Sequence, residues 1–226
     1  MAINTVRTID DRVRVRTVLA SVWDKTGLER LVPGLLAAIP DVSILSTGGT
    51  FEAIGELLGP LAAEHLRQVS DYTGQPEMQG GLVKTLDWRI YLGLLSETHN
   101  PAHRDDMRKH RTAAIDMVVV NLYPFGRTIG RPGATPEDAR GNIDIGGPCM
   151  VRAGAKNFHR VAVLTDPADY PRVIADLAAG GGTLTLATRF DLAKKAFRLT
   201  AEYETAIAAY LAGVGPEVMA AAYEVR

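Results

Sequence analysis

The chain has 226 residues, of which 46% are hydrophobic and 23% are charged, which excludes a disordered or collagen-like protein. Its 25 basic and 26 acidic residues give a formal charge of −1, so there is no overall positive field to hold long nucleic acid, and any bound anion needs a local pocket. The single cysteine, Cys149, cannot form an intramolecular disulfide, and no apolar run approaches the ~18 residues needed to span a bilayer. We therefore expect a cytoplasmic protein without a membrane segment.

The first half of the chain alternates short apolar runs with segments of helical periodicity. Strands are predicted over residues 16–22, 42–45, 66–69, 89–95 and 115–122. Leucine and isoleucine recur at helical spacing after the first two strands, and residues 103–111 suit a polar surface helix. Residues 71–81 are rich in turn-forming residues, and we interpret them as a functional loop. The alternation predicts an α/β fold with a parallel sheet flanked by helices.

After residue 125 the pattern becomes mostly helical. A loop with one short helix is expected over residues 126–142, followed by helices over 147–157, 169–179 and 185–211 and a strand over 160–165. No Ser/Pro-rich linker separates this part from the first. We therefore predict one domain over residues 16–212 with a C-terminal helical extension, a flexible leader over 1–15 and a tail over 213–226.

Polar clusters follow the predicted strands at the ends where an open parallel sheet binds ligands. They lie at residues 21–27, 46–50, 121–123 and 144–147. Their convergence at one edge of the sheet carries more weight than any single motif and indicates a ligand site there.

Residues 46–50, Ser-Thr-Gly-Gly-Thr, have the components of a phosphate cradle before a helix. Glycines let backbone amides approach an anion, hydroxyls donate hydrogen bonds, and the amino end of the helix favours negative charge. Lys25 follows the neighbouring strand and can add a charge. The structural alternative is an ordinary turn with Thr50 as N-cap and Lys25 as a solvated lysine. The spacing is not that of a P-loop.

Three further side chains are candidates for chemistry, each with a structural alternative. Lys84 follows a glycine-rich loop and can bind phosphate or polarise a carbonyl, but surface loop lysines are common. Tyr123 can donate to a developing oxyanion, or it can cap the core with its hydroxyl in water. Asp144 precedes Gly146 and Gly147 and can act as a general base, or it can simply sit at a helix N-terminus. Lys156 ends that helix, where a cation is usual.

The remaining reactive residues give no site. Cys149 has no catalytic partner nearby in the sequence, so we interpret it as a small core residue. The five histidines show no metal-ligand spacing with cysteines or carboxylates. We predict no metal and no cofactor.

Six segments occur together in an order that resembles one family. They are SVWDKTGL at 21–28, LSTGGT at 45–50, VSDYTGQPEMQGGLVKTL at 69–86, IDMVVVNLYPF at 115–125, NIDIGGPCMVRAGAKN at 142–157 and KKAFRLTAEYETAIAAYL at 194–211. The chain resembles the IMP cyclohydrolase domain of the bifunctional purine biosynthesis enzyme, AICAR formyltransferase/IMP cyclohydrolase. The resemblance implies a methylglyoxal-synthase-like parallel sheet with a helical extension.

The resemblance also implies an activity and its residues. The family closes the purine ring of formyl-AICAR ribotide to give IMP, with loss of water and without cofactor or metal. The catalytic positions of the family fall on Lys84, Tyr123, Asp144 and Lys156. Its substrate-binding and phosphate-binding positions fall on Ser21, Lys25, Thr47, Gly48, Gly49, Thr50, Thr85, Asn121, Ile145, Gly146 and Gly147. Lys84, Tyr123 and the two glycine amides would stabilise the oxyanion, and Asp144 with Lys156 would remove the amide proton.

The chain departs from the family pattern next to these positions. Leu82, Asp87 and Trp88 stand where the family has arginine, histidine and proline, and Trp23 replaces a small hydroxyl residue. Loss of an arginine removes a bidentate contact to phosphate. Two alternatives therefore stay open: a paralogue that closes a related ribotide ring in specialised nucleoside metabolism, and a purine-nucleotide-binding module without catalysis.

The formyltransferase half of the bifunctional enzyme has no counterpart after residue 211. We accordingly expect a separate formyltransferase to supply the formyl group, and, from the family, a homodimer that binds a small-molecule purine ribotide and neither long nucleic acid nor membrane.

Overall fold

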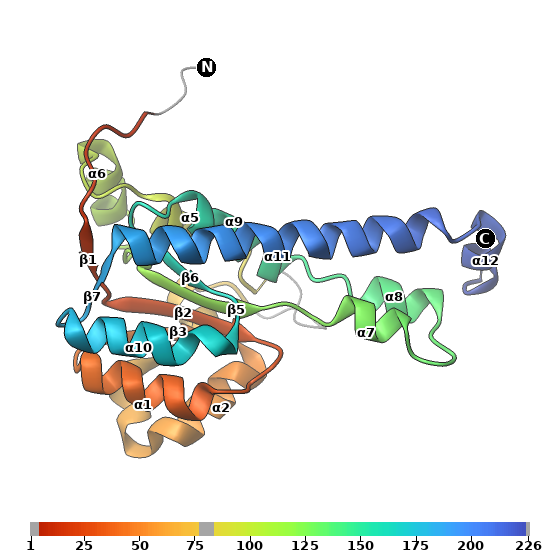
Figure 1. Ribbon diagram of the computed structural model, residues 1–226, viewed down its shortest axis with the longest axis horizontal. Coiled ribbons are helices and arrows are strands. Elements are labelled where there is room, and N and C mark those ends of the chain that lie inside the picture. The colour runs from red at the N-terminus through yellow and green to blue at the C-terminus, as the bar shows by residue number, and fades with distance from the viewer. Residues whose placement is uncertain (1–4, 77–83, 225–226) are drawn as a thin grey trace.

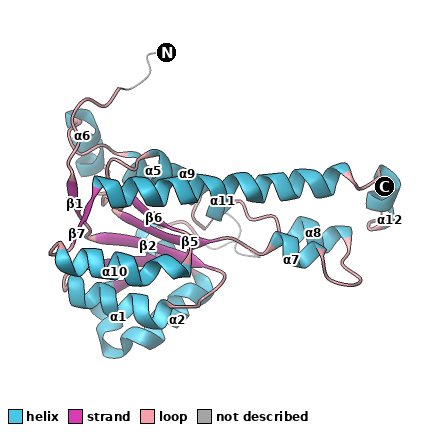
Figure 2. Cartoon of the chain, in the orientation of Figure 1, coloured by secondary structure: helices cyan, strands magenta, loops and turns pink. Residues whose placement is uncertain are grey.

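The computed structural model describes residues 5–76 and 84–224, and a five-stranded parallel sheet lies at its centre. The strand order is β4-β3-β2-β5-β6, and all four pairings are parallel. The strands are β2 (Thr17–Val22), β3 (Ser43–Ser46), β4 (Leu66–Gln68), β5 (Met117–Asn121) and β6 (Ala162–Leu164). The predicted parallel sheet is confirmed, and helices cover both of its faces (Figures 1 and 2).

Each face of the sheet carries its own apolar core, because successive strand side chains point to opposite faces. In β5, Met117 and Val119 join one core, and Val118 and Val120 join the other. The first core is completed mainly by α1 (Leu28–Ala38), α2 (Gly48–Leu58) and α10 (Tyr170–Ala179). The second is completed mainly by α5 (Trp88–Leu95), α9 (Gly146–Lys156) and α11 (Leu186–Ala212). The apolar run that predicted a doubly covered strand is therefore explained by burial on both sides.

The N-terminal segment differs from the flexible leader that we predicted over residues 1–15. Its residues Arg12–Arg14 form β1, which pairs antiparallel with β7 (Thr183–Thr185). The guanidinium of Arg189, only 1% exposed, donates hydrogen bonds to the carbonyls of Asp10 and Asp11 at 2.8 and 3.0 Å. These contacts fix the segment against the C-terminal part of the chain, which no local pattern in the first 15 residues could reveal. Residues 1–4 lie outside the described residues.

The predicted strand over residues 89–95 is wrong, because this segment forms α5. The carboxylate of Asp87 accepts a hydrogen bond from the Arg89 amide at 2.8 Å and caps the helix. Ile90 and Leu94, one turn apart, are both fully buried, so helical spacing suits the site better than strand alternation. The predicted loop over residues 71–81 begins inside helix α4 (Val69–Thr73), and its part from 77 to 81 lies outside the described residues.

The long helix α11 forms the predicted C-terminal extension. It crosses one face of the sheet and continues beyond it, with α7 and α8 along its distal half and α12 past its end (Figure 1). The described short elements are α3 (Ala62–His65), α6 (Pro101–Lys109), α7 (Phe125–Ile129), α8 (Pro136–Gly141), α12 (Pro216–Ala221) and the 3-10 turns η1 (Gly59–Leu61) and η3 (Pro167–Asp169). Residues 126–142 thus hold most of α7 and all of α8, where we predicted one helix, and α12 lies in the predicted tail. None of the helices in the described ranges is long and apolar enough to cross a bilayer.

An ion pair lies buried next to β5. The Arg160 guanidinium contacts the Asp116 carboxylate at 2.8 Å, and their side chains are 6% and 9% exposed. Asp116 also accepts hydrogen bonds from the amides of Arg16 and Thr17 at 2.9 and 3.1 Å. Burial raises the pKa of Asp116, and the Arg160 charge opposes this rise. The pair ties β2, β5 and the segment before β6 together.

Candidate active site

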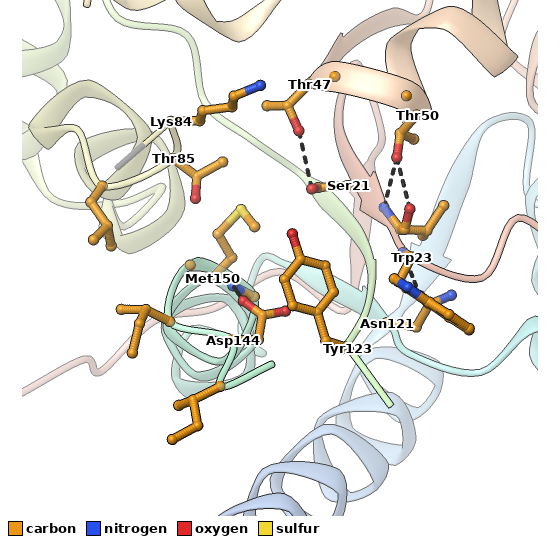
Figure 3. Close-up of a pocket in the computed structure, with 18 of the residues that line it drawn as sticks. Ser21, Trp23, Thr47, Thr50, Lys84, Thr85, Asn121, Tyr123, Asp144 and Met150 are labelled. Atoms are coloured by element: carbon orange, nitrogen blue, oxygen red, sulfur yellow. Dashed lines mark hydrogen bonds between the residues drawn. The ribbon is translucent and has the colours of Figure 1, made fainter. Parts of the chain in front are cut away.

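A cavity of about 570 Å³ lies at the carboxyl ends of β2, β3 and β5, where the amino ends of α2 and α9 converge (Figure 3). Every predicted site residue except Lys156 lines it. These residues are Ser21, Lys25, Thr47, Gly48, Gly49, Thr50, Lys84, Thr85, Asn121, Tyr123, Asp144, Ile145, Gly146 and Gly147. The fold thus brings together residues that are up to about 125 positions apart in the sequence, as the strand-end argument predicts.

The α2 end of the cavity is suited to an anion. Gly48 has a φ of +47°, a conformation that favours glycine, and the backbone amides of the first turn of α2 begin there. The ammonium of Lys84 lies 3.5 Å from the point where a Cβ on Gly48 would stand, and that of Lys25 lies 3.8 Å from the corresponding point on Gly49. The hydroxyls of Ser21 and Thr47 are 3.2 Å apart on the same side. Two cations, two hydroxyls and a helix N-terminus therefore meet at one place.

Two of the predicted binding residues use their polar atoms inside the protein. The Thr50 hydroxyl accepts from the Val22 amide at 3.0 Å and donates to the Val22 carbonyl at 2.9 Å, so it locks α2 onto β2. The side chain of Asn121 accepts from the amides of Trp23 and Asp24 at 2.8 and 2.9 Å and donates to the Asp24 carbonyl at 2.7 Å. Both side chains shape the wall of the cavity by fixing the segment after β2.

The opposite end of the cavity carries the carboxylate of Asp144 beside the ring of Tyr123 (Figure 3). The Asp144 Oδ1 atom accepts a hydrogen bond from the Gly147 amide at 2.8 Å, so the carboxylate pairs with one of the free amides in the first turn of α9. Burial raises the pKa of Asp144, and hydrogen bonds from the Gly147 and Tyr123 main chains only partly oppose it. Tyr123 is 45% exposed, and its hydroxyl points across the cavity toward Ser21.

Thr85 lies close to the first residue of α9. Its hydroxyl oxygen lies 2.6 Å from the point where a Cβ on Gly146 would stand, and the residue is only 6% exposed. A side chain at position 146 would therefore force the hydroxyl of Thr85 to shift. The charged residues among the described lining are Lys25, Lys84 and Asp144, which puts positive charge at the α2 end and negative charge at the α9 end.

Lys156 is not brought into this cavity. It is exposed at the last turn of α9, ten residues beyond Gly146 and hence about 15 Å along the helix axis from it. A cation at this place complements the carboxyl end of the helix, which is the structural alternative that the sequence already offered.

The residues that depart from the family pattern fall into different places. Trp23 lines the cavity, and the Arg127 guanidinium lies 5.5 Å from the centre of its ring. Asp87 and Trp88 are not among the lining residues, because Asp87 caps α5 and Trp88 packs edge-on against His110 with ring centres 5.0 Å apart. Leu82 lies outside the described residues.

Sequence reasoning did not single out Leu86, Ile143 and Met150, which add apolar surface to the lining. Met150 follows Gly147 by three residues in α9, so helical spacing would have placed it on the same face. Ile143 and Leu86 are neighbours of predicted residues and carry no signal of their own. In the described parts of the chain, no group of three or more His, Cys, Asp or Glu side chains gathers closely enough to hold a metal ion.

Comparison with known proteins gives two family matches. The MGS-like domain family model matches residues 30–149, and the AICARFT/IMPCHase bienzyme model matches residues 154–225. The bifunctional purine biosynthesis protein PurH of Neisseria meningitidis serogroup A is 44% identical over 211 residues, which are 93% of this chain and 38% of that protein. PurH of Neisseria gonorrhoeae is 44% identical over 205 residues, covering 91% and 38%.

A solved structure is also similar. The crystal structure of ForH superposes with a TM-score of 0.72 at 33% sequence identity, covering 86% of this chain and 97% of that chain. The chain described here thus spans 38% of the length of these PurH proteins and nearly all of ForH.

Proposed function

Since this chain belongs to the MGS-like domain family and resembles the IMP cyclohydrolase domain of PurH, we propose that it is a cyclohydrolase. The proposed reaction closes the purine ring of formyl-AICAR ribotide and gives IMP and water. The observation that carries the proposal is a cavity with an anion-binding end that holds two lysines and an opposite end that holds a partly buried carboxylate. A ribotide needs the first for its phosphate, and the reaction needs the second for a proton.

Asp144 is the proposed general base. The carboxamide nitrogen of the substrate attacks the formyl carbon and must lose a proton as the new C–N bond forms. Because burial raises the pKa of Asp144, its carboxylate is a stronger base than an exposed aspartate, which suits proton removal near neutral pH. This proton is passed to the former formyl oxygen, which becomes a hydroxyl group. The hydroxyl group and the hydrogen of the formamide nitrogen then leave together as water, and a C=N double bond forms.

Tyr123 and the Gly146 amide are the proposed oxyanion donors. The ring of Tyr123 lies beside Asp144 and its hydroxyl points into the cavity, and Gly146 is the first residue of α9, where amides lack a partner within the helix. The Gly147 amide, which we expected to share this task, already donates to Asp144. Loss of one oxyanion donor typically lowers the rate by about 10²–10³-fold.

Lys25 and Lys84 are the proposed phosphate ligands, together with the amino end of α2. In this structure the Lys84 ammonium lies beside Gly48, so its charge supports the anion end of the cavity. Lys84 also precedes Thr85, whose hydroxyl lies at the Gly146 position, and the family resemblance implies that Lys84 stabilises the oxyanion. Either role makes Lys84 a sensitive probe of the site.

Incubation of the purified chain with formyl-AICAR ribotide, with IMP quantified by chromatography, tests the proposal. The parent protein is compared with Lys84→Ala and with Lys109→Ala, an exposed lysine on α6 far from the cavity lining. We expect IMP formation by the parent, a loss of at least about 10²-fold in kcat/KM for Lys84→Ala, and no change for Lys109→Ala. Absence of IMP with folded parent protein would refute the cyclohydrolase.

A second candidate is closure of a related ribotide ring in specialised nucleoside metabolism. Trp23 favours it, because a large indole lines the cavity where the family has a small hydroxyl residue. A panel of ribotides that carry adjacent formamido and carboxamide groups separates the two candidates by relative kcat/KM. IMP binding without turnover of any member would instead support a nucleotide-binding module.

The same proposal implies a source for the formyl group, a cellular location and an oligomeric state. The formyl group of the substrate requires a formyltransferase activity, which we assign to a separate polypeptide or segment. We propose a cytoplasmic homodimer, and light scattering of the purified chain measures its mass.

A further inference from the structure

The segment that carries Asp144 is held by a side chain from the far end of the chain. The Asp144 amide donates a hydrogen bond to the Tyr203 hydroxyl oxygen at 2.8 Å. The same hydroxyl donates to the Asn142 carbonyl at 3.0 Å. One hydroxyl group therefore bridges the main chain on both sides of Ile143, directly before the proposed base.

The ring of Tyr203 contacts the second catalytic segment. It packs edge-on against Phe125 with ring centres 6.3 Å apart. The Phe125 amide in turn donates to the Tyr123 carbonyl at 2.8 Å. Tyr203 is only 8% exposed, and it belongs to the second apolar core together with Phe125. A single side chain thus connects the segments of Asp144 and Tyr123.

We propose that Tyr203 is a positioning residue for ring closure, whose hydroxyl fixes the main chain of Asp144 and whose ring fixes the segment of Tyr123. This inference rests on the proposed function, because it assigns Asp144 and Tyr123 to the reacting atoms. Tyr203 itself has no place among the residues that line the main cavity.

The position of Tyr203 on α11 explains why a long helix suits this task. A helix holds a side chain more rigidly than a loop does, and Asp144 stands on a short connection between α8 and α9. The first turn of α11 is anchored by Arg189, which donates to main-chain carbonyls that include those of Phe158 and His159 at 3.1 and 2.9 Å. The helix is therefore fixed to the body of the sheet at one end and holds the catalytic segment farther along.

This arrangement gives the helical extension a catalytic role in addition to its packing role. The MGS-like match ends at residue 149 and contains Asp144 and Tyr123, whereas Tyr203 lies within the bienzyme match at 154–225. The proposed base, Asp144, and the residue that positions it, Tyr203, therefore come from parts of the chain that match two different family models. Geometry matters here because a misplacement of about 1 Å can lower a rate about 10²-fold.

Tyr203→Phe is the test, because phenylalanine keeps the ring on Phe125 and removes only the hydroxyl. Tyr210→Phe is the matched control. Tyr210 lies two turns further on the same helix and packs on Phe125 with ring centres 5.8 Å apart, and its hydroxyl makes no hydrogen bond within the described residues. We expect Tyr203→Phe to lower kcat by about 10- to 100-fold with KM within about threefold. Tyr210→Phe is expected to change neither constant by more than about twofold.

Amide hydrogen exchange provides a second measurement that does not depend on turnover. In the parent, the Asp144 amide should exchange at least about tenfold more slowly than a solvated loop amide. In Tyr203→Phe, exchange should accelerate over residues 142–147 while β5 and the second half of α9 keep their protection. If the chain closes no ribotide ring, the proposed function fails, and the exchange data alone still decide whether Tyr203 holds the Asp144 segment.

Three results would overturn the inference. The first is a kcat for Tyr203→Phe equal to that of the parent. The second is an unprotected Asp144 amide in the parent, which needs no variant and so holds even if Tyr203→Phe fails to fold. The third is a uniform rise in exchange across the sheet, which would indicate a general loss of stability in place of local positioning.

Discussion

Replacement of Gly147 by alanine tests the geometry on which the proposed base depends. A Cβ at this position would stand 2.5 Å from Asp144 Oδ2 and 2.7 Å from Leu122 Cδ2. Ordinary van der Waals contact begins at 3.4 Å, so both groups have to move away from the new methyl group by several tenths of an ångström to about 1 Å. Leu122 is held in the apolar core, so the larger movement is expected of the carboxylate.

The magnitude follows from two opposing effects on stability. Insertion of a methyl group into a packed site typically costs about 1–3 kcal/mol, and replacement of glycine in a helix by alanine returns about 0.5–1 kcal/mol. The net loss of about 0–2.5 kcal/mol corresponds to a fall in Tm of up to roughly 10 °C for a chain of this size. Displacement of the Asp144 carboxylate by up to about 1 Å should lower kcat by about 10²-fold, an effect far larger than the loss of folded protein.

Steady-state kinetics and calorimetry of Gly147→Ala measure both effects. Gly126→Ala is the control, because Gly126 lies in helix α7 and a Cβ there meets no atom within 4 Å. The control should keep its kcat and its Tm or gain slightly in Tm. If Gly147→Ala kept the kcat and Tm of the parent, Asp144 would not be confined as the structure indicates, and the reasoning would be refuted.

Three further predictions concern charge. Asp144→Asn keeps an acceptor for the Gly147 amide but removes the proposed base, so kcat should fall by about 10²–10⁴-fold. Since burial raises the pKa of Asp144, the kcat/KM of the parent should begin to fall at a higher pH on acidification than for an aspartate of ordinary pKa 3.8. For the same reason, the thermal stability of the variant at pH 7 should equal or exceed that of the parent. Lys156→Ala should keep kcat within about threefold, because Lys156 lies outside the cavity lining, and a larger loss in folded protein would contradict the placement. Arg160→Met leaves Asp116 buried without its partner and should lower the free energy of unfolding by about 3–5 kcal/mol in denaturant titrations. The double variant that also carries Asp116→Asn should recover part of this loss. A loss below about 1 kcal/mol in the single variant would show that the pair is solvated.

The parallel sheet and most of the cavity lining could be predicted from the sequence. One edge of a parallel sheet collects the carboxyl ends of all its strands, so polar clusters that follow the strands lie together. This rule predicts that Ser21, Thr47 and Asp144 lie near one another, and all three line the cavity. Residue type and spacing suffice for such a statement, since it depends only on chain order and strand direction.

The direction of individual side chains could not be predicted. Thr50 and Asn121 are polar residues at the right strand ends, yet their polar atoms bind the segment after β2. Helix α5 resembles a strand in composition, and only burial of Ile90 and Leu94 on one helical face distinguishes the two. The leader prediction was wrong for Arg12–Arg14 because their partner strand lies about 170 residues later. In each case a long-range contact decides what the local pattern leaves open.

In the proposed reaction, the two ends of the cavity have different tasks, and each lies at a helix terminus. The amino end of α2 meets Lys25 and Lys84, so an anion bound there gains from amides and charges together. The amino end of α9 meets Asp144, whose carboxylate takes up the Gly147 amide and so leaves the Gly146 amide for a developing oxyanion. The amino end of α9 already holds a negative group of the protein, Asp144, and the amino end of α2 is left for a negative group of the ligand. A phosphate at the Asp144 end would face a like charge, so the ligand is held in one orientation. If the ligand is the proposed ribotide, the polarity of the cavity therefore favours the one direction of binding that brings its base to Asp144.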